Sequence, residues 1–205
     1  MAIMPTTANE TINYLNEDKR NELRAGMENF FQLANLNYNN ELSLVSVDFQ
    51  DRDAFIRNDE DGYENSESKP MARYCPDREI ICVCADNLSK FVNDFRRDLC
   101  INNSLQFISS AFLLCDLVLL HEFMHGYQHL VEHKNLTHGN RVLEEEVNRR
   151  AAIILTYTCE NNEDFIKKAI TFYEGKSEFG FGDGISLDEL VINRNDIEYL
   201  VNIFP

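Results

Sequence analysis

Residues 111–125 read Ala-Phe-Leu-Leu-Cys-Asp-Leu-Val-Leu-Leu-His-Glu-Phe-Met-His, and this apolar run leads directly into two histidines spaced by four. It belongs to a longer stretch of helical periodicity that begins near Ser104 and reaches about His133. Positions four apart lie one turn up the same helix face, so the rings of His121 and His125 can converge on one metal ion. The sequence therefore predicts a long apolar helix that carries a pair of metal ligands.

Residues 121–125 form a His-Glu-x-x-His motif, whose residue types suit a hydrolytic zinc site. Imidazole nitrogens bind zinc at about 2.0–2.1 Å, and Glu122, beside the first histidine, can reach a zinc-bound water as general base. From the composition, about 0.01 occurrences of this motif are expected by chance in the chain. The competing interpretation is a histidine-rich amphipathic helix whose polar edge simply faces solvent.

A third ligand has to come from another segment, and residues 143–152, Leu-Glu-Glu-Glu-Val-Asn-Arg-Arg-Ala-Ala, are the obvious source. Successive helix positions point about 100° apart, so at most one of Glu144, Glu145 and Glu146 can face the metal. Glu144 is our choice because its helix face is the one most expected to pack inward. That face also holds Val147, Asn148, Ala151 and Leu155. Glu146 is the alternative ligand, and Glu145 is expected to be more exposed.

The three histidines that follow the motif are less suited to bind the same ion. His129 lies about 12 Å up the helix from His121, too far to share a metal with both ligands. One class of zinc peptidases has a third histidine at position 131, where this chain has Val131. We interpret His129 and His133 as surface or edge residues, and we keep His138 as a loop residue that could approach the site.

The His-Glu-x-x-His helix, a short loop and a second helix with Glu144 and Asn148 together resemble the gluzincin metallopeptidases. The likeness is greatest to the small ImmA/IrrE-type peptidases with a minimal zincin core, and it covers positions 79–155. Glu144 follows His125 by 19 residues, an interval similar to that in the family. The resemblance implies a zinc-dependent endopeptidase with one zinc ion, in which Glu144 is the third ligand and Asn148 supports the site from outside the coordination sphere. Val147 stands where the family usually has alanine.

The same resemblance supplies a mechanism. Zinc would polarise the scissile carbonyl, while Glu122 takes a proton from the attacking water and passes it to the leaving amine. A side chain that stabilises the oxyanion is also expected, and the sequence does not choose among several candidates. They are Tyr127, His138, Tyr157 and Tyr173.

The whole pattern predicts an α+β fold that is predominantly helical, with a small curved sheet packed against the active-site helix and the glutamate helix. We expect one domain over 1–205, with an N-terminal helical segment in 1–40 and an acidic loop or insertion at 51–76. Strands are expected at 42–49 and 79–85. By the resemblance, the strand 79–85 would border the cleft and pair with extended substrate. Further helices are expected at 86–100, 141–159, 162–173 and in the C-terminal tail.

The net charge of −16, from 19 basic and 35 acidic residues, disfavours partners that are themselves anionic. Nucleic acids and anionic membrane surfaces require basic patches, so we expect neither as a partner. We expect a monomer that acts on a basic protein substrate. Two alternatives come from other functional classes: a catalytically idle zinc-binding module, and an acidic interaction protein that mimics nucleic acid.

The cysteine content and the N-terminal residues indicate the cellular compartment in which the protein is expected. Six cysteines are too sparse for a disulfide-stapled domain, and residues 1–7 lack the basic and apolar stretches of a secretory signal. We therefore expect reduced thiols in a cytoplasmic protein, or in one delivered into another cell by a route that needs no signal peptide. Cys82 and Cys84 share one face of a predicted strand, which favours core packing over metal binding.

Overall fold

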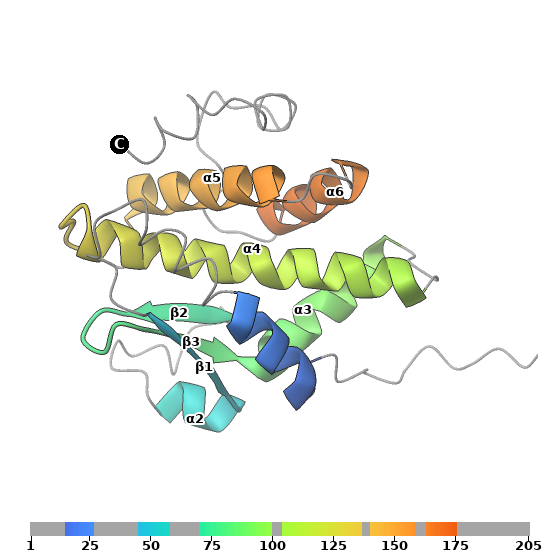
Figure 1. The fold of residues 1–205 in the computed structure, drawn as a ribbon, viewed down its shortest axis with the longest axis horizontal. Coiled ribbons are helices and arrows are strands. Elements are labelled where there is room, and N and C mark those ends of the chain that lie inside the picture. Colours follow the sequence, from blue (N-terminus) through green and yellow to red (C-terminus); the bar gives the residue numbers. More distant parts are fainter. Residues whose placement is uncertain are drawn as a thin grey trace, which may run out of the picture.

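The computed structural model describes residues 15–26, 45–57, 70–99, 104–136, 140–158 and 163–175. Its elements form three layers, and the long helix α4 (Ser104–Leu130) is the middle one (Figure 1). A small sheet lies on one side of α4, and α5 (Arg141–Thr158) and α6 (Glu163–Glu174) lie on the other. The fold is α+β and predominantly helical, which confirms the predicted class.

The sheet has three strands in the order β1-β3-β2. The central strand β3 (Ile80–Cys84) runs parallel to β1 (Ser46–Gln50) and antiparallel to β2 (Ala72–Cys75). Residues 79–85, expected to pair with substrate, therefore coincide with a strand that is hydrogen-bonded on both sides, and that expectation is wrong. The edge strand that lies against α4 is β2, through contacts described below.

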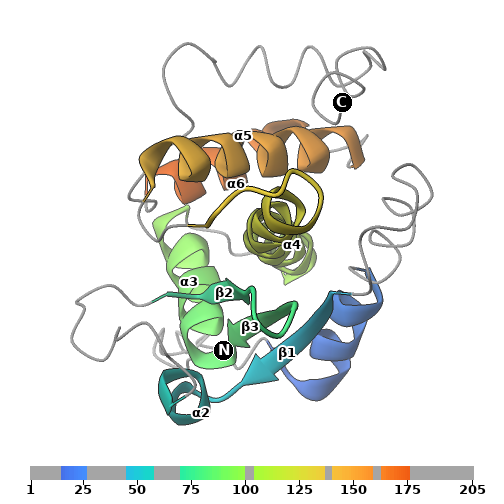
Figure 2. The ribbon, with the colours of Figure 1, turned by 90° about the vertical axis from the view of Figure 1, so that its left-hand side faces the viewer.

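Helix α4 is buried around its whole circumference over much of its length. Leu114, Leu117 and Leu119 point in different directions on the helix, yet each is fully buried. A helix that is apolar on all sides belongs in the interior, and Figure 2 shows α4 nearly end-on between the sheet and α5. Among the described residues, the structure contains no helix whose length and apolarity would let it traverse a bilayer.

Two elements lie in the segment 51–76, which the sequence predicts as a loop or insertion. Helix α2 (Arg52–Arg57) begins where Asp51 Oδ1 accepts the N–H of Ala54 at 2.7 Å, a side-chain cap of the helix N-terminus. Strand β2 follows near the end of the segment. Residues 58–69 lie outside the described part of the chain, so the loop prediction is corrected for 52–57 and 72–75.

Most other element predictions agree with the structure. Helix α3 (Ala85–Asp98) corresponds to the predicted 86–100, and α5 and α6 correspond to 141–159 and 162–173. Within the predicted N-terminal helical segment, residues 17–26 are helical. The remainder of 1–40, apart from the described residues 15–26, lies outside the described chain, as does the C-terminal tail 176–205.

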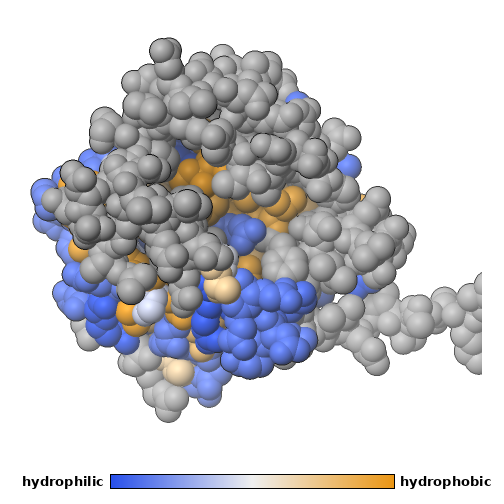
Figure 3. All heavy atoms as spheres, in the orientation of Figure 1, coloured by the Kyte–Doolittle hydropathy of each residue, from blue (hydrophilic) through white to orange (hydrophobic). Residues whose placement is uncertain are grey.

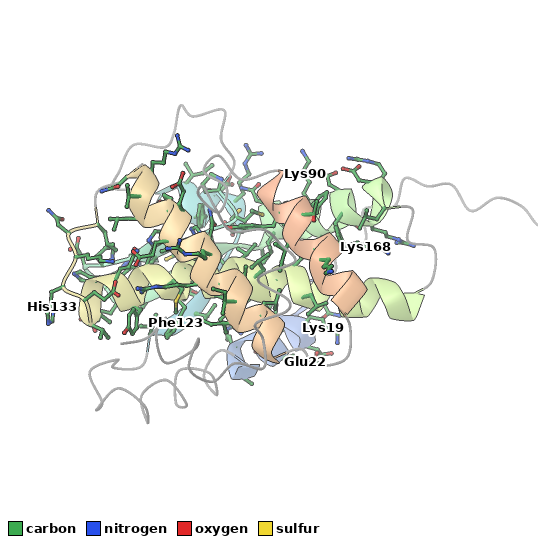
Figure 4. All side chains as sticks on the ribbon, turned by 90° about the horizontal axis from the view of Figure 1, so that it is seen from above. Lys19, Glu22, Lys90, Phe123, His133 and Lys168 are labelled. Atoms are coloured by element: carbon green, nitrogen blue, oxygen red, sulfur yellow. The ribbon has the colours of Figure 1, made fainter. Side chains whose placement is uncertain are left out.

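The helical segment 17–26 has a buried side and a hydrophilic side. Leu23 is 2% exposed in the core. One turn before Leu23, Lys19 Nζ lies 2.7 Å from Glu22 Oε2, and the Glu22 side chain is 54% exposed (Figure 4). In the space-filling view the surface of this segment is accordingly hydrophilic, and hydrophobic side chains appear above it over α4 (Figure 3).

The face of the sheet away from α4 has its own small apolar cluster. Phe55 of α2 packs with Cys82 and Cys84, both fully buried, which confirms the prediction that these two cysteines pack in the interior. Arg73 of β2 spans the same face, with its guanidinium carbon 4.6 Å from the centre of the Phe55 ring. Alternation along β2 therefore sends Arg73 to the α2 side and Tyr74 to the α4 side.

Asp116 interrupts the apolar run of α4 and provides a test of how α4 is buried. Burial raises the pKa of Asp116 to about 7, whereas an unfolded chain releases this proton near pH ~3.9. The folded state thus binds more protons between these values, and the free energy of unfolding should fall as pH rises from about 4 to 7. Because the residue keeps some solvent contact, the fall should stay below about 1.4 kcal/mol per pH unit.

Urea denaturation of the wild type and of Asp116→Asn across this pH range measures the free energy of unfolding. An equal pH dependence in both proteins would contradict the assignment.

Candidate metal centre

Three side-chain atoms converge between α4 and α5. His121 Nε2 lies 3.2 Å from His125 Nε2, and Glu144 Oε2 lies 3.4 Å from each of them. Ligand atoms bound at about 2.0–2.1 Å around a tetrahedral ion are separated from one another by about 3.3–3.4 Å. The triangle therefore has the dimensions of three ligands on one tetrahedral ion, which leaves a fourth position for water or substrate.

The second nitrogen of each imidazole ring is held by an amide side chain. His121 Nδ1 lies 2.8 Å from Asn148 Oδ1, and His125 Nδ1 lies 3.2 Å from Gln128 Oε1. An amide oxygen can only accept, so each Nδ1 must carry the proton. In the neutral rings both Nε2 atoms then present lone pairs to the centre, which is the state that binds a metal.

The orientation of Gln128 follows from what its other end contacts. Gln128 Nε2 donates to Glu146 Oε2 at 2.8 Å and to the backbone carbonyl of Leu143 at 3.3 Å. Both of these partners accept only, so the amide nitrogen must face them and the amide oxygen must face His125. The side chain is fully buried, and this arrangement fixes the tautomer of His125 from the neighbouring helix α5.

The convergent lone pairs need a positive charge between them. With both Nδ1 atoms protonated, two nitrogen lone pairs and a carboxylate oxygen face one another at 3.2–3.4 Å, which is repulsive unless a cation or a proton intervenes. Burial raises the pKa of Glu144 and lowers the pKa of His121. The hydrogen bonds and opposite charges between Glu144 and the histidines outweigh burial for both groups. The net effect lowers the pKa of Glu144 and raises that of His121. The donor set thus fits a cation.

Glu122 lies beside this triangle as a fourth polar group with a different anchor. It is 9% exposed, and its Oε2 accepts the backbone N–H of Tyr74 in β2 at 2.7 Å. One ligand atom from each of His121, Glu122 and His125 lies within 4.8 Å of the others, so this cluster could hold a metal ion. The edge strand β2 thereby fixes the carboxylate next to the histidines.

The rotation of α5 determines which glutamate meets the histidines. Asn140 Oδ1 accepts the N–H of Val142 at 3.2 Å where α5 begins. From that start, Glu144 shares a face with Val147, Asn148 and Ala151, all at most 1% exposed. The structure therefore brings Glu144 to both histidines and Asn148 to His121.

The other two glutamates have different partners. Glu146, the alternative ligand, pairs with Lys134 at 2.7 Å and with Arg150 at 2.8 Å, in addition to Gln128. Glu145 pairs with Arg141 one turn earlier in α5. Its side chain is 22% exposed against 21% for Glu144, so Glu145 is the more exposed of the two, as predicted, but by a margin too small to separate them. The three glutamates differ in the direction in which their side chains leave α5, and not in how exposed they are.

The histidines beyond the motif lie away from the triangle. His129 Nδ1 lies 3.3 Å from the hydroxyl of Tyr74 at the sheet edge. His133 is exposed just past the end of α4 and projects from that end of the molecule in Figure 4. These positions agree with their interpretation as edge and surface residues, while His138 lies outside the described residues.

Of the tyrosines considered for oxyanion stabilisation, the two with described side chains differ in position. The ring of Tyr173 in α6 lies 6.2 Å from that of His121, centre to centre. Burial, and then the charges of Glu122 and Glu144, raise the pKa of Tyr173, so its hydroxyl stays protonated and able to donate. Tyr127 instead lies under the guanidinium of Arg150, 5.5 Å from its central carbon.

In comparisons with family models, with curated proteins and with solved structures, no match to this chain is found. The chemistry of the site is therefore inferred from the positions of its own residues. Gln128 is the residue of the site that sequence reasoning missed. Its position three residues after His125, on the same helix face, is the signal that could have identified it.

Replacing the acidic residue of the triangle should remove the metal. Glu144→Ala leaves the two imidazoles as the only members of the triangle, so zinc added to the purified protein should be lost on dialysis against a weak chelator. Glu145→Ala, one position along the same helix, is the matched control and should retain zinc. Elemental analysis of both proteins gives the answer. Full zinc retention in Glu144→Ala would rule out this residue as a ligand.

Removing either amide that holds a histidine ring should weaken zinc binding measurably, but less than removing a ligand. Asn148→Ala and Gln128→Ala each free one imidazole to rotate, and either change should weaken zinc affinity by about 10–100-fold. Competition with a fluorescent zinc chelator measures the affinity, and circular dichroism confirms that the variants remain folded. Unchanged affinity in folded variants would show that the rings do not need these contacts.

Proposed function

We propose that the protein is a zinc-dependent endopeptidase in which His121, His125 and Glu144 bind zinc and Glu122 is the general base. The observation that carries the proposal is the convergence of three donor atoms at 3.2–3.4 Å beside a separate, buried carboxylate. Structural zinc sites fill all four positions with protein ligands and need no base. A three-ligand site with an adjacent carboxylate is the arrangement of a hydrolase.

The choice of zinc rests on the donor set. Two imidazoles and one carboxylate form a ligand set that catalytic zinc sites use, with the fourth position left for water. Magnesium and calcium prefer shells made of oxygen alone, so the two nitrogen donors argue against both ions. The spacing of the donor atoms also suits tetrahedral rather than octahedral geometry, because ligands at right angles would lie about 2.9 Å apart at the same bond length.

The chain's own residues would divide the work of hydrolysis. A divalent cation held by the triangle would supply the polarisation of the peptide carbonyl and the acidification of a water. Glu122, with one oxygen occupied by the Tyr74 N–H at 2.7 Å, would take a proton from that water and pass it to the leaving amine. Asn148 and Gln128 would keep the imidazole rings in the metal-binding tautomer. Tyr173, whose ring centre lies 6.2 Å from that of His121, is our candidate to donate a hydrogen bond toward developing negative charge.

The substrate we propose is a basic protein bound in an extended conformation. The net charge of −16 would attract a basic segment. Since β3 is the central strand, β2 is the strand beside the site that an extended peptide could approach from its edge. Glu122 already holds one N–H of that edge, so a bound backbone would pass close to the general base.

The isosteric substitution Glu122→Gln should separate binding from catalysis. The amide retains the size of the side chain but cannot accept a proton, so the variant should bind zinc normally and lose about 10²–10⁴-fold in cleavage rate. Incubating a proteome with each protein and identifying new N-termini by mass spectrometry gives the comparison. Equal numbers of new N-termini with both proteins would refute the role of Glu122. Zinc binding with no new N-termini from either protein would favour an idle metal-binding module.

The charge of the protein should appear in the salt dependence of cleavage. For a basic substrate, the rate constant at low substrate concentration should fall as ionic strength rises, because the screening length shrinks to about 8 Å near physiological salt. Two peptides with the same cleavage sequence, one flanked by lysines and one by glutamines, form the matched pair. The lysine peptide should be the better substrate only at low salt. A rate that does not depend on salt for either peptide would contradict a role for the charge.

A further inference from the structure

A pair of thiols lies on the face of the sheet opposite α4, apart from the metal centre. Cys75 Sγ in β2 and Cys82 Sγ in β3 are 3.4 Å apart. In the antiparallel register Cys82 is opposite Arg73, so Cys75 and Cys82 are diagonal neighbours on the same face. Cys82 is fully buried, whereas Cys75 is partly exposed at the end of the edge strand. One sulfur can thus meet solvent while the other is sheltered.

Cationic and polar donors surround the two sulfurs. The turn at 76–79 folds Arg78 back, so that its Nη2 lies 3.5 Å from Cys75 Sγ and 3.4 Å from Cys82 Sγ. Gln50 of β1 approaches Cys82 Sγ with its Nε2 at 3.7 Å. Donors of this kind stabilise a thiolate, and a thiolate beside a guanidinium is the reactive form of cysteine.

The two thiols are not equivalent. The hydrogen bond between the two sulfurs lowers the pKa of Cys75, burial opposes it, and Arg78 lowers it further, to about 6 in total. The same hydrogen bond and burial raise the pKa of Cys82. These directions favour ionisation at Cys75 over Cys82. The more exposed sulfur is also the more nucleophilic one.

We propose that Cys75 and Cys82 form a redox-active pair that a hydroperoxide converts into a disulfide. The Cys75 thiolate attacks one peroxide oxygen, the O–O bond breaks, and the sulfur becomes a sulfenic acid while the other oxygen leaves as hydroxide or alkoxide. The Cys82 sulfur then attacks the sulfenic sulfur, the S–S bond forms, and water leaves with the thiol proton. The two thiols lose two electrons in total, and the hydroperoxide gains them. A reducing thiol reverses the change.

Forming this bond would move the edge strand. A disulfide needs a sulfur–sulfur distance of about 2.05 Å, so the two sulfurs must approach by about 1.4 Å. Cys75 is the last residue of β2, and the residue before it, Tyr74, donates its N–H to Glu122. Oxidation would thus disturb the strand that anchors the general base. This consequence rests on the proposed function, whereas the disulfide itself does not.

Peptide mapping after peroxide treatment tests the proposal on the full chain. The folded protein is exposed to hydrogen peroxide, denatured with an alkylating agent and digested, and the linked peptides are identified by mass spectrometry. We expect a Cys75–Cys82 link in the wild type and in the matched control Cys84→Ser, in which a neighbouring buried cysteine is removed. Cys82→Ser should instead accumulate a sulfenic acid at Cys75 that reacts with dimedone. This readout requires neither metal nor peptidase activity.

Two outcomes would overturn the proposal. Alkylation of both Cys75 and Cys82 after peroxide treatment would show that the pair is not oxidised. Dimedone labelling of Cys75 in the wild type, without the link, would show that Cys82 does not resolve the sulfenic acid. Arg78→Met provides an independent check, since removal of the guanidinium should slow alkylation of Cys75 at neutral pH several-fold. An unchanged rate would exclude Arg78 as the group that activates the thiol.

Discussion

Two imidazole nitrogens and a carboxylate oxygen lie 3.2–3.4 Å apart where α4 meets α5, and they would repel one another without a positive charge between them. Holding them there requires both helices to be fixed in rotation as well as in position. Burial on all sides fixes α4, and the packing of Val147 and Ala151 fixes the face that α5 turns toward it. The free energy of the core thus maintains an arrangement that is unfavourable unless a cation or a proton lies between these atoms.

Polar contacts around the centre complete this support. Glu146 is held by Lys134 and Arg150 and in turn orients Gln128, so a chain of contacts runs from the ion pairs to the His125 ring. The same edge strand anchors Glu122 through the N–H of Tyr74 and ends at Cys75, so the base of the metal centre and the thiol pair both contact one short strand. We infer that both properties depend on how firmly β2 is held by β3.

Local periodicity is sufficient to predict α4, α5 and the pair of histidines, because helical spacing alone determines which side chains share a face. It also identifies Glu144 and Asn148 as neighbours on the buried face of α5. Strand β2 has four residues, and its existence depends on pairing with β3, which no local pattern reveals. The central position of β3 is non-local for the same reason. Gln128 escaped prediction because its role depends on contacts with α5 rather than on its own residue type.

The central claim is that one zinc ion is bound by two imidazoles and one carboxylate. X-ray absorption spectroscopy of the zinc-loaded full chain tests it most directly, because it reports the atoms bound to the metal. The account predicts four nitrogen and oxygen neighbours at about 2.0–2.1 Å, with the multiple-scattering signature of two imidazole rings. A shell with sulfur at about 2.3 Å would contradict it, since the ion would then be bound by cysteines instead of the histidines of α4.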